Sequence, residues 1–281
     1  MTLSGYDAYR EELTALAAHD GRVVCLAATP AGTNHPFELA HPDRFFALPR
    51  AASAMVEVVS GLVTAGFRPF VCTGAARGGL GTAGSLGLLT RYLEAGATVV
   101  TPYAGFLEDY PVLRRLVDVT LAVPCGDAET RAVVREAASA DRPFHIRVDS
   151  LLRACRPRGD VVPGAPVPVV GWESPGACDA TVCLVSVGED GTGMARAARD
   201  AAPWLAHAHL VYLDDAHLRR AARELGRRYR RFVVTGARYG ADGVTETLAR
   251  LLPGREVVAG PWEGEAASGV LDAVHRMTAC A

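Results

Sequence analysis

The stretch RAASAMVEVVSGLVTAGFRPFVCT, residues 50–73, decides the fold of this chain. Its first part, residues 50–65, is an alanine- and valine-rich segment long enough to predict an apolar helix. Its last part, residues 69–73, is a short run rich in branched and aromatic residues, which predicts a buried strand. A helix that leads into a buried strand is the repeating unit of proteins with parallel sheets.

The same unit of helix and strand recurs before and after this stretch. We expect further strands at residues 22–28, 97–101, 117–123, 144–148, 181–187, 208–213, 231–235 and 256–259. We expect further helices at residues 6–19, 82–95, 128–140, 194–202, 215–225, 244–252 and 266–277. Apolar strands that alternate with helices are buried on both faces. The sequence therefore predicts an α/β fold built from mainly parallel sheets, each covered by helices to give three layers.

The alternation breaks once, between residues 149 and 180. The segments RPRGD at 156–160 and PGAP at 163–166 are typical of loops. We therefore predict two domains, residues 1–150 and 180–281, joined by a linker at 151–179. A chain of 281 residues is long enough for two such domains to bury a core each.

Composition argues against several functions. The net charge is −2 and no basic patch dominates, so we expect neither nucleic acid nor a membrane surface as partner. The chain contains no lysine, which excludes a Schiff-base lysine and a phosphate-loop lysine. Seven cysteines without a CxxC pair argue against a disulfide framework and a zinc site. The sequence has no signal-peptide pattern and no long apolar run, so we expect a cytoplasmic protein. We also expect no metal site in this chain.

Several motifs in the first predicted domain form a recognisable series. They are DRFF at 43–46, LEDYPVLR at 107–114, VPCGDAETR at 123–131 and PFHIRV at 143–148. In order and spacing this series resembles the pyrimidine-binding domain of the transketolase family, whose members use thiamine diphosphate to transfer two-carbon units. Residues 180–281 resemble the C-terminal domain of the same family in the order of strands and helices.

The resemblance covers two family domains and lacks the third, which holds the diphosphate and magnesium through a Gly-Asp-Gly motif and an asparagine. It therefore implies the small subunit of a split enzyme, with a separate chain carrying most of the thiamine diphosphate and Mg²⁺ site. The assembly would be a heterodimer or heterotetramer that transfers a two-carbon ketol or related acyl unit to a small molecule. Because the usual residues are altered, we expect a specialised biosynthetic pathway.

The family's key cofactor contacts are replaced in this chain. The glutamate that activates the pyrimidine ring corresponds to Ala52, and Glu57 lies five residues further on, more than one helical turn away. The aromatic residue that stacks on the ring corresponds to Gly74 and Ala75. By the resemblance, Ala52, Gly74 and Ala75 would line the cofactor. The histidine of the family's Gly-Pro-Thr-His loop is also missing, so the catalytic residue stays unassigned.

Three residues are candidates for substrate binding. His35 lies in a loop after the first strand and faces either the site entrance or solvent. Arg77 lies in a glycine-rich loop and has the chemistry to bind a phosphate or carboxylate. Arg147 ends a strand where the family has a substrate-contacting arginine, and a structural ion pair is the alternative. The nearby residues 79–84 match GxGxxG, which taken alone would indicate a dinucleotide-binding site. Such a site also has an acidic residue at the end of a second strand about 20 residues further on. This chain has none there, which favours a glycine-rich turn.

The remaining polar motifs have structural interpretations. Asp127 and Glu129 begin a helix, where carboxylates bind free amides. His207 and His209 alternate on a strand without a third metal ligand. The sequence GEDG at 188–191 is interpreted as a turn between strand and helix.

Two other functions remain open beside the split enzyme. The chain could be a non-catalytic scaffold or regulatory subunit that has lost the activating glutamate. The fold could also have been recruited to a role on a small molecule without the cofactor.

Overall fold

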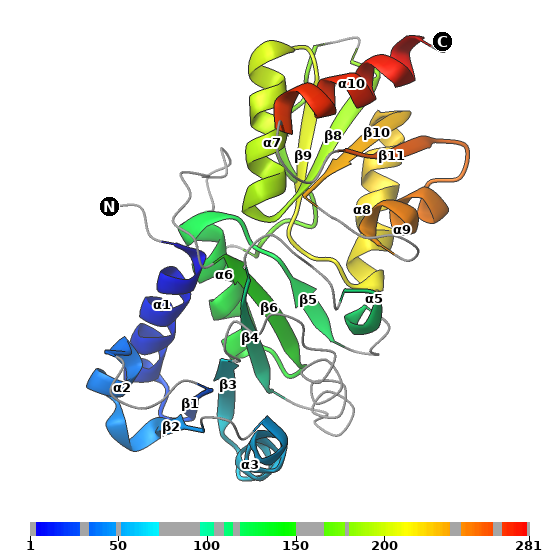
Figure 1. Cartoon of the computed structure of the whole chain (residues 1–281). Helices are drawn as coiled ribbons and strands as arrows, with labels where there is room; N and C mark the ends of the chain where they lie inside the picture. Colours follow the sequence, from blue (N-terminus) through cyan, green and yellow to red (C-terminus); the bar gives the residue numbers. More distant parts are fainter. Residues whose placement is uncertain are drawn as a thin grey trace.

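The computed structural model describes residues 4–28, 34–48, 52–72, 96–103, 110–114, 119–149, 166–177, 180–236, 243–260 and 266–279. These residues build two sheets, each flanked by helices, and Figure 1 shows the second sheet above the first. The first sheet has the strand order β2-β1-β3-β4-β6-β5, and the second has the order β11-β10-β8-β9-β7. The predicted α/β fold with two mainly parallel sheets is confirmed.

The first half of the chain, up to residue 149, supplies the six-stranded sheet. Its strands are β1 (Val23–Ala27), β2 (Phe45–Ala47), β3 (Arg68–Cys72), β4 (Thr98–Tyr103), β5 (Thr120–Ala122) and β6 (Phe144–Asp149), and all pair in parallel. Its helices are α1 (Gly5–His19), α2 (Pro36–Ala40), a 3-10 turn (Pro42–Arg44), α3 (Ala52–Thr64), α5 (Tyr110–Leu113) and α6 (Gly126–Ser139).

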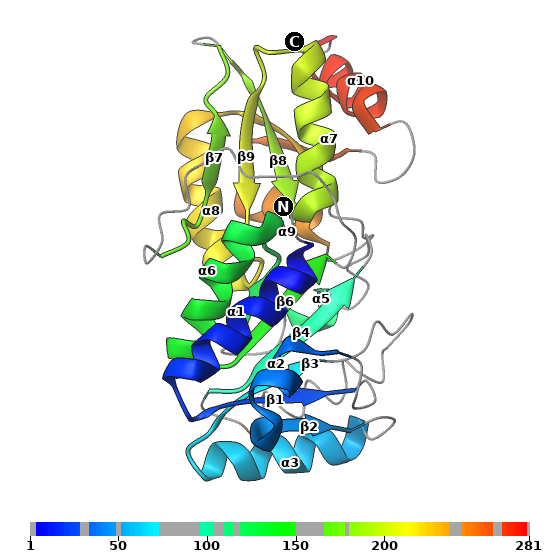
Figure 2. The same cartoon turned by 90° about the vertical axis from the view of Figure 1, so that its left-hand side faces the viewer.

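Helices cover both faces of this sheet. On one face α1 and α6 pack against alternate residues of β6, with Leu13, Phe144 and Ile146 in a common apolar cluster. On the other face α3 contributes Met55 and Val59 to a second cluster. Figure 2 shows α3 beneath the sheet, on the far side from α1. The predicted helix at 82–95 lies outside the described residues.

The second half, from residue 166 on, supplies the five-stranded sheet. Its strands are β7 (Gly171–Ser174), β8 (Val182–Val187), β9 (Ala206–Leu210), β10 (Arg231–Thr235) and β11 (Glu256–Ala259). Its helices are α7 (Gly188–Ala201), α8 (Asp215–Arg228), α9 (Val244–Leu251) and α10 (Ala266–Ala279). Only β7 among these strands runs antiparallel to its neighbour β9. Helices α8 and α9 share one apolar cluster, and α7 and α10 share another, so the two pairs cover opposite faces.

Some elements differ from the sequence predictions. Strand β7 lies inside the range predicted as a linker, and the short elements α2, β2 and α5 were not predicted. In these four short elements the pattern of apolar residues is too weak to set them apart from the loops around them. Helix α7 begins at Gly188 instead of 194 because three early glycines mask its helical pattern. Strand β9 ends at Leu210, three residues before the prediction.

The two halves are joined by main-chain hydrogen bonds. After β9 the chain runs antiparallel to β5, the edge strand of the first sheet. The Val123 amide donates to the Val211 carbonyl at 2.7 Å, and the Leu213 amide donates to the Leu121 carbonyl at 2.8 Å. Between these two hydrogen bonds, Tyr212 forms an isolated antiparallel bridge with Ala122 of β5. Residues 211–213, the joining segment, therefore complete an otherwise open edge.

The described cysteines, Cys25, Cys72, Cys125 and Cys183, are buried, where cysteine behaves as a small apolar residue. Across the part of the chain that the structure describes, we find no helix with the length and hydropathy needed to cross a membrane.

Candidate functional site

The carboxyl edge of the first sheet is the place where the topology favours a ligand. In open parallel sheets, ligands bind outside the carboxyl ends of the strands, where the connections turn in opposite directions. Here β1 connects to β2 on one side, whereas its neighbour β3 connects to β4 on the other. The crevice between β1 and β3 is therefore the candidate site.

The predicted cofactor residues all follow strands that end at this edge. Ala52 is the first residue of α3, the helix that comes after β2. Gly74 and Ala75 come directly after β3 in the sequence, and they lie outside the described residues. The same holds for Arg77 and for the glycine-rich run at 79–84. Their roles remain predictions.

His35 follows β1 in the sequence, and only 2% of its surface is exposed. It caps α2, because its Nδ1 atom accepts a hydrogen bond from the Phe37 amide at 3.2 Å. Its ring also lies 5.2 Å from the ring of Phe45. The alternative of a solvent-exposed loop histidine is wrong. The physical reason is that α2, which was not predicted, holds the ring against the sheet.

The protonation of His35 follows from these contacts. Burial and the nearby Arg10 guanidinium lower the pKa of His35 to about 4, so the ring is neutral at pH 7. Since Nδ1 accepts a hydrogen bond, the proton of the neutral ring is on Nε2. That Nε2 atom is buried and has no hydrogen-bond partner. The segment between β1 and β2 thus holds a buried donor without a hydrogen-bond partner.

Helix α1 supplies polar side chains near the same crevice. The Arg10 guanidinium donates to the Asn34 carbonyl at 2.9 Å and holds the start of the segment before α2. The Tyr6 hydroxyl lies 3.5 Å from the Cys72 sulfur at the end of β3. Burial raises the pKa of the Cys72 thiol to about 11, so it stays protonated and is a poor nucleophile.

Arg147 lies on the opposite face of β6 from the apolar cluster. It pairs in register with Thr101 of β4, and only 6% of it is exposed. On the same face, His145 Nε2 lies 3.1 Å from the Thr101 hydroxyl. Burial, with a smaller effect of Arg147, lowers the pKa of His145 to about 3. Such burial suits the structural alternative for Arg147, and its contact with substrate remains a prediction.

The described residues do not fit the family's way of activating the cofactor. Glu57 is the only carboxylate in α3, and it is exposed. A carboxyl group that activates a pyrimidine ring must lie in a dry site, where burial raises its pKa. Glu57 does not meet this requirement, so we derive no chemical step from α3.

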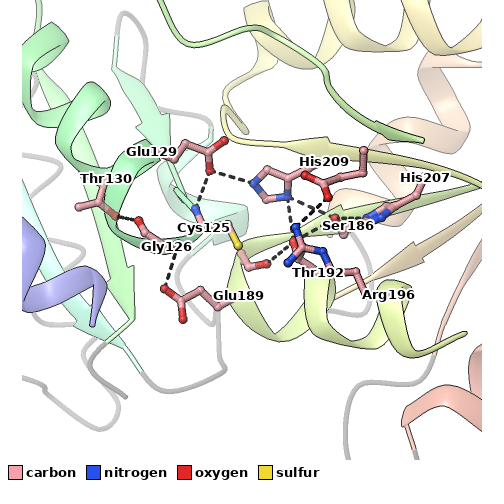
Figure 3. A network of polar contacts seen from close by, with 12 residues as sticks. Cys125, Gly126, Glu129, Thr130, Ser186, Glu189, Thr192, Arg196, His207 and His209 are labelled. Carbon is pink, nitrogen blue, oxygen red and sulfur yellow. Dashed lines mark hydrogen bonds and ion pairs between the residues drawn. The ribbon is translucent and has the colours of Figure 1, made fainter. Parts of the chain in front are cut away.

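A network of polar side chains joins the two halves at the carboxyl edge of the second sheet (Figure 3). The Ser186 hydroxyl lies 2.8 Å from His207 Nε2 and 3.2 Å from His209 Nδ1. His209 Nε2 lies 3.1 Å from Glu129 Oε2, which also accepts from the Cys125 amide at 2.6 Å. Glu129 therefore caps α6, as predicted, and in addition binds the second half.

The series Ser186, His209 and Glu129 has the order of an activated nucleophile, its base and an orienting acid. Ser186 is 0% exposed and His209 is 1% exposed, so no substrate reaches the hydroxyl. The network is therefore structural. Among the described residues, no group of three or more histidine, cysteine or acidic side chains is arranged to hold a metal.

The GEDG segment was predicted as a turn, but in the structure it is the first turn of helix α7, directly after β8. Gly188 has a φ of 64°, a conformation that favours glycine. A Cβ on Gly191 would lie 2.4 Å from the Thr235 carbonyl oxygen, and one on Gly236 would lie 2.4 Å from the Val187 carbonyl oxygen. These glycines let β8, α7 and β10 meet backbone to backbone, which closes the crevice between β8 and β10.

Comparisons with known proteins agree with this architecture. No model of a protein family matches the chain. "Putative uncharacterized transketolase family protein y4mN" of Sinorhizobium fredii is 28% identical, over 48% of this chain and 43% of that protein. The chain thus corresponds to less than half the length of this curated relative.

Solved structures match over the whole chain. A chain described as "Split gene transketolase, inactive beta4 tetramer" has a TM-score of 0.82 at 21% identity and covers 98% of both chains. Transketolase from Campylobacter jejuni has a TM-score of 0.70 at 15% identity, over 99% of this chain and 47% of that one. The resemblance to the transketolase family is confirmed in fold.

Proposed function

We propose that this chain is the small subunit of a split transketolase-like enzyme, a transferase of two-carbon ketol or related acyl units. One observation carries the proposal: the chain corresponds end to end with a chain described as part of a split transketolase. In the Campylobacter jejuni enzyme the same fold occupies 47% of the chain. A separate chain would supply the remainder.

The partner chain would hold most of the thiamine diphosphate and Mg²⁺, and the shared active site would form at the carboxyl edge of the first sheet. The buried and unpartnered Nε2 of His35 at this edge supports the idea. Buried donors without partners are rare in proteins and call for an explanation. A group brought by substrate or partner would provide one. We propose a specialised biosynthetic pathway, because the family's cofactor contacts are altered. We also propose that the enzyme is cytoplasmic.

The test is to capture the tagged chain from lysate of its native organism with thiamine diphosphate and Mg²⁺ present, and to identify what copurifies by mass spectrometry. We expect a stoichiometric second chain with a Gly-Asp-Gly motif, bound cofactor, and turnover that stops when the cofactor is removed. Recovery of this chain alone, or of a complex that turns over equally well without the cofactor, would refute the proposal.

A scaffold or regulatory subunit is the second candidate, favoured by one observation. Helix α3 begins with Ala52 where the family has its glutamate, and its only carboxylate is exposed. The variants His35→Asn and Arg77→Ala separate the two functions in the assembled complex. The enzyme proposal expects each to reduce kcat/KM, whereas a scaffold leaves it unchanged. Arg276→Ala, at an exposed position on α10, is the control.

A further inference from the structure

The outer side of α8 carries a row of arginines. Arg220, Arg223 and Arg227, here called the arginine stripe, are all exposed. Their spacing of three and four residues places them in one row along the helix. The other side of α8 is buried, with Leu218 and Leu225 in the apolar cluster of the second half. Figure 1 shows α8 at the side of the second sheet.

The carboxylates of α8 do not neutralise the stripe, because they have other partners. Asp215 lies 3.7 Å from Arg219, and Glu224 accepts a hydrogen bond from the Trp172 indole at 2.6 Å. In the part of the chain that the structure describes, none of the three stripe arginines forms an ion pair. The Arg223 Nε atom donates to the Arg219 carbonyl at 3.3 Å, which leaves its charge without a counter-ion.

The long helices of the first half differ from α8 in this respect. Arg131 and Arg135 of α6 are also four residues apart, and both bind Glu12 of α1, at 3.3 Å and 2.8 Å. Opposite charges thus hold α1 and α6 together. The stripe has the same kind of spacing and no such neighbour.

Folding of the chain gives no reason for this arrangement. Like charges three or four residues apart destabilise a helix. The helix dipole favours Arg227, which lies in the last turn of α8, but it does not favour Arg220 and Arg223 in the middle of the helix. An acidic partner from outside the chain would remove the repulsion.

Spacing and charge define this partner. Arg220 and Arg227 are seven residues apart, which is about 10 Å along the helix axis. An acidic helix with carboxylates every three or four residues presents a matching row, and guanidinium groups bind carboxylates through two parallel hydrogen bonds. Proteins that bind nucleic acid make roughly 6–10 phosphate contacts, and three arginines are too few. Because the whole chain has a net charge of −2 with these arginines included, the rest of it is acidic and repels a long polyanion or an anionic membrane.

We propose that the arginine stripe is a docking surface for an acidic helix of a partner protein. Exposed ion pairs are individually weak, so the stripe speeds the encounter and fixes the orientation of the two helices more than it adds affinity. The stripe shares no residue with the candidate site, and the inference does not depend on the proposed function.

The experiment uses the full chain and two labelled helical peptides of identical composition. One peptide has its glutamates on one face, three and four residues apart, and the other has them spread around the helix. At low ionic strength we expect the one-faced peptide to bind about tenfold more tightly in fluorescence polarisation, and added salt to reduce the difference. Equal binding of the two peptides would overturn the proposal. Tighter binding of a DNA duplex or of anionic vesicles at the same concentration of charge would rule out an acidic helix as the preferred partner.

Variants locate the binding. Arg220→Gln combined with Arg223→Gln removes two exposed charges that repel each other, so the chain should fold without a loss in Tm. This pair should weaken binding of the one-faced peptide about fivefold. Arg22→Gln combined with Arg276→Gln removes the same charge at exposed positions elsewhere and should change binding by less than about twofold. Equal weakening by the two pairs would mean that only net charge matters and that the stripe is not the docking surface.

Discussion

In both sheets the strand connections change direction at one point of the carboxyl edge, between β1 and β3 in the first sheet and between β8 and β10 in the second. The contacts near these two points differ. In the second sheet, Gly191 and Gly236 bring backbones into contact and close the crevice between β8 and β10. Beside them, Glu129 and His209 belong to a buried network that joins the halves. In the first half, by contrast, the segment between β1 and β2 holds a buried donor, Nε2 of His35, without a partner.

The strongest test of this comparison removes the network at the second edge. Glu129→Ala leaves the Cys125 amide and His209 Nε2 without their acceptor. Each buried orphan costs about 1–3 kcal/mol, so we expect a loss of about 4 kcal/mol in the free energy of unfolding. Urea denaturation measures it. Asp127→Ala, in the same helical turn but bonded only to the adjacent amide, should cost less than about 1 kcal/mol. Equal costs would show that the network does not join the halves.

The next test disturbs the close contact between α7 and the end of β10. Gly191→Ala places a Cβ against the Thr235 carbonyl, and overpacking of this kind costs about 1–3 kcal/mol. Gly193, two residues along the same helix, has no atom within 4 Å of such a Cβ. Gly193→Ala should therefore stabilise the protein by about 0.5–1 kcal/mol, because glycine weakens helix interiors. The two unfolding midpoints should move in opposite directions, and a shift in the same direction would contradict the close packing.

The free energy of unfolding should depend on pH through His35 in the first half of the chain. A histidine in the unfolded chain has a pKa near 6.5, and in the folded chain the pKa of His35 is about 4. Between these values the unfolded chain binds more protons, so stability is complete above about pH 6.5 and falls as the pH drops toward 4. We expect this residue to contribute roughly 2–3 kcal/mol to that fall.

The variant His35→Asn isolates this contribution, because asparagine keeps a capping acceptor for α2 and does not titrate. Denaturation curves between pH 4 and 7 should show a shallower loss of stability than in the parent chain. His275→Asn, at an exposed position on α10, should leave the slope unchanged. An unchanged slope in His35→Asn would mean that the ring is not held neutral by burial.

The smallest effect is expected at Glu57. Because its side chain is exposed on α3, Glu57→Gln should change the free energy of unfolding by less than about 0.5 kcal/mol. It should also leave the turnover of the assembled complex unaltered. A large drop in kcat would show that α3 supplies a catalytic carboxylate after all and would restore the likeness to the family at this edge.

Much of the fold could be predicted from the sequence, because long elements carry their own periodicity. Strands such as β8 and β10 and helices such as α1 and α8 fall close to their expected ranges. Two short edge strands, β2 and β7, could not be predicted. Strand β7 has four residues and depends on its pairing with β9, and β2 has three and depends on β1.

The candidate site could be predicted only in part. The motif series pointed to the edge where His35 and Ala52 lie, since chain order determines which loops meet there. The contacts between the two halves could not be foreseen. His209 meets Glu129 across 80 positions of sequence, and Arg114 meets Thr247 across 133. The interpretation of Glu129 as a helix cap is correct, but it does not include the contact between the halves.

The joining segment has a consequence for synthesis of the protein. Strand β5 is made early, but its outer side is covered only when residues 211–213 have emerged from the ribosome. Roughly ninety residues separate them, which at about 5–20 residues per second leaves the strand uncovered for several seconds or more. An uncovered edge strand is a template for pairing with other chains. The nascent first half is therefore the aggregation-prone stage of this protein, and a truncation before residue 211 makes that stage permanent.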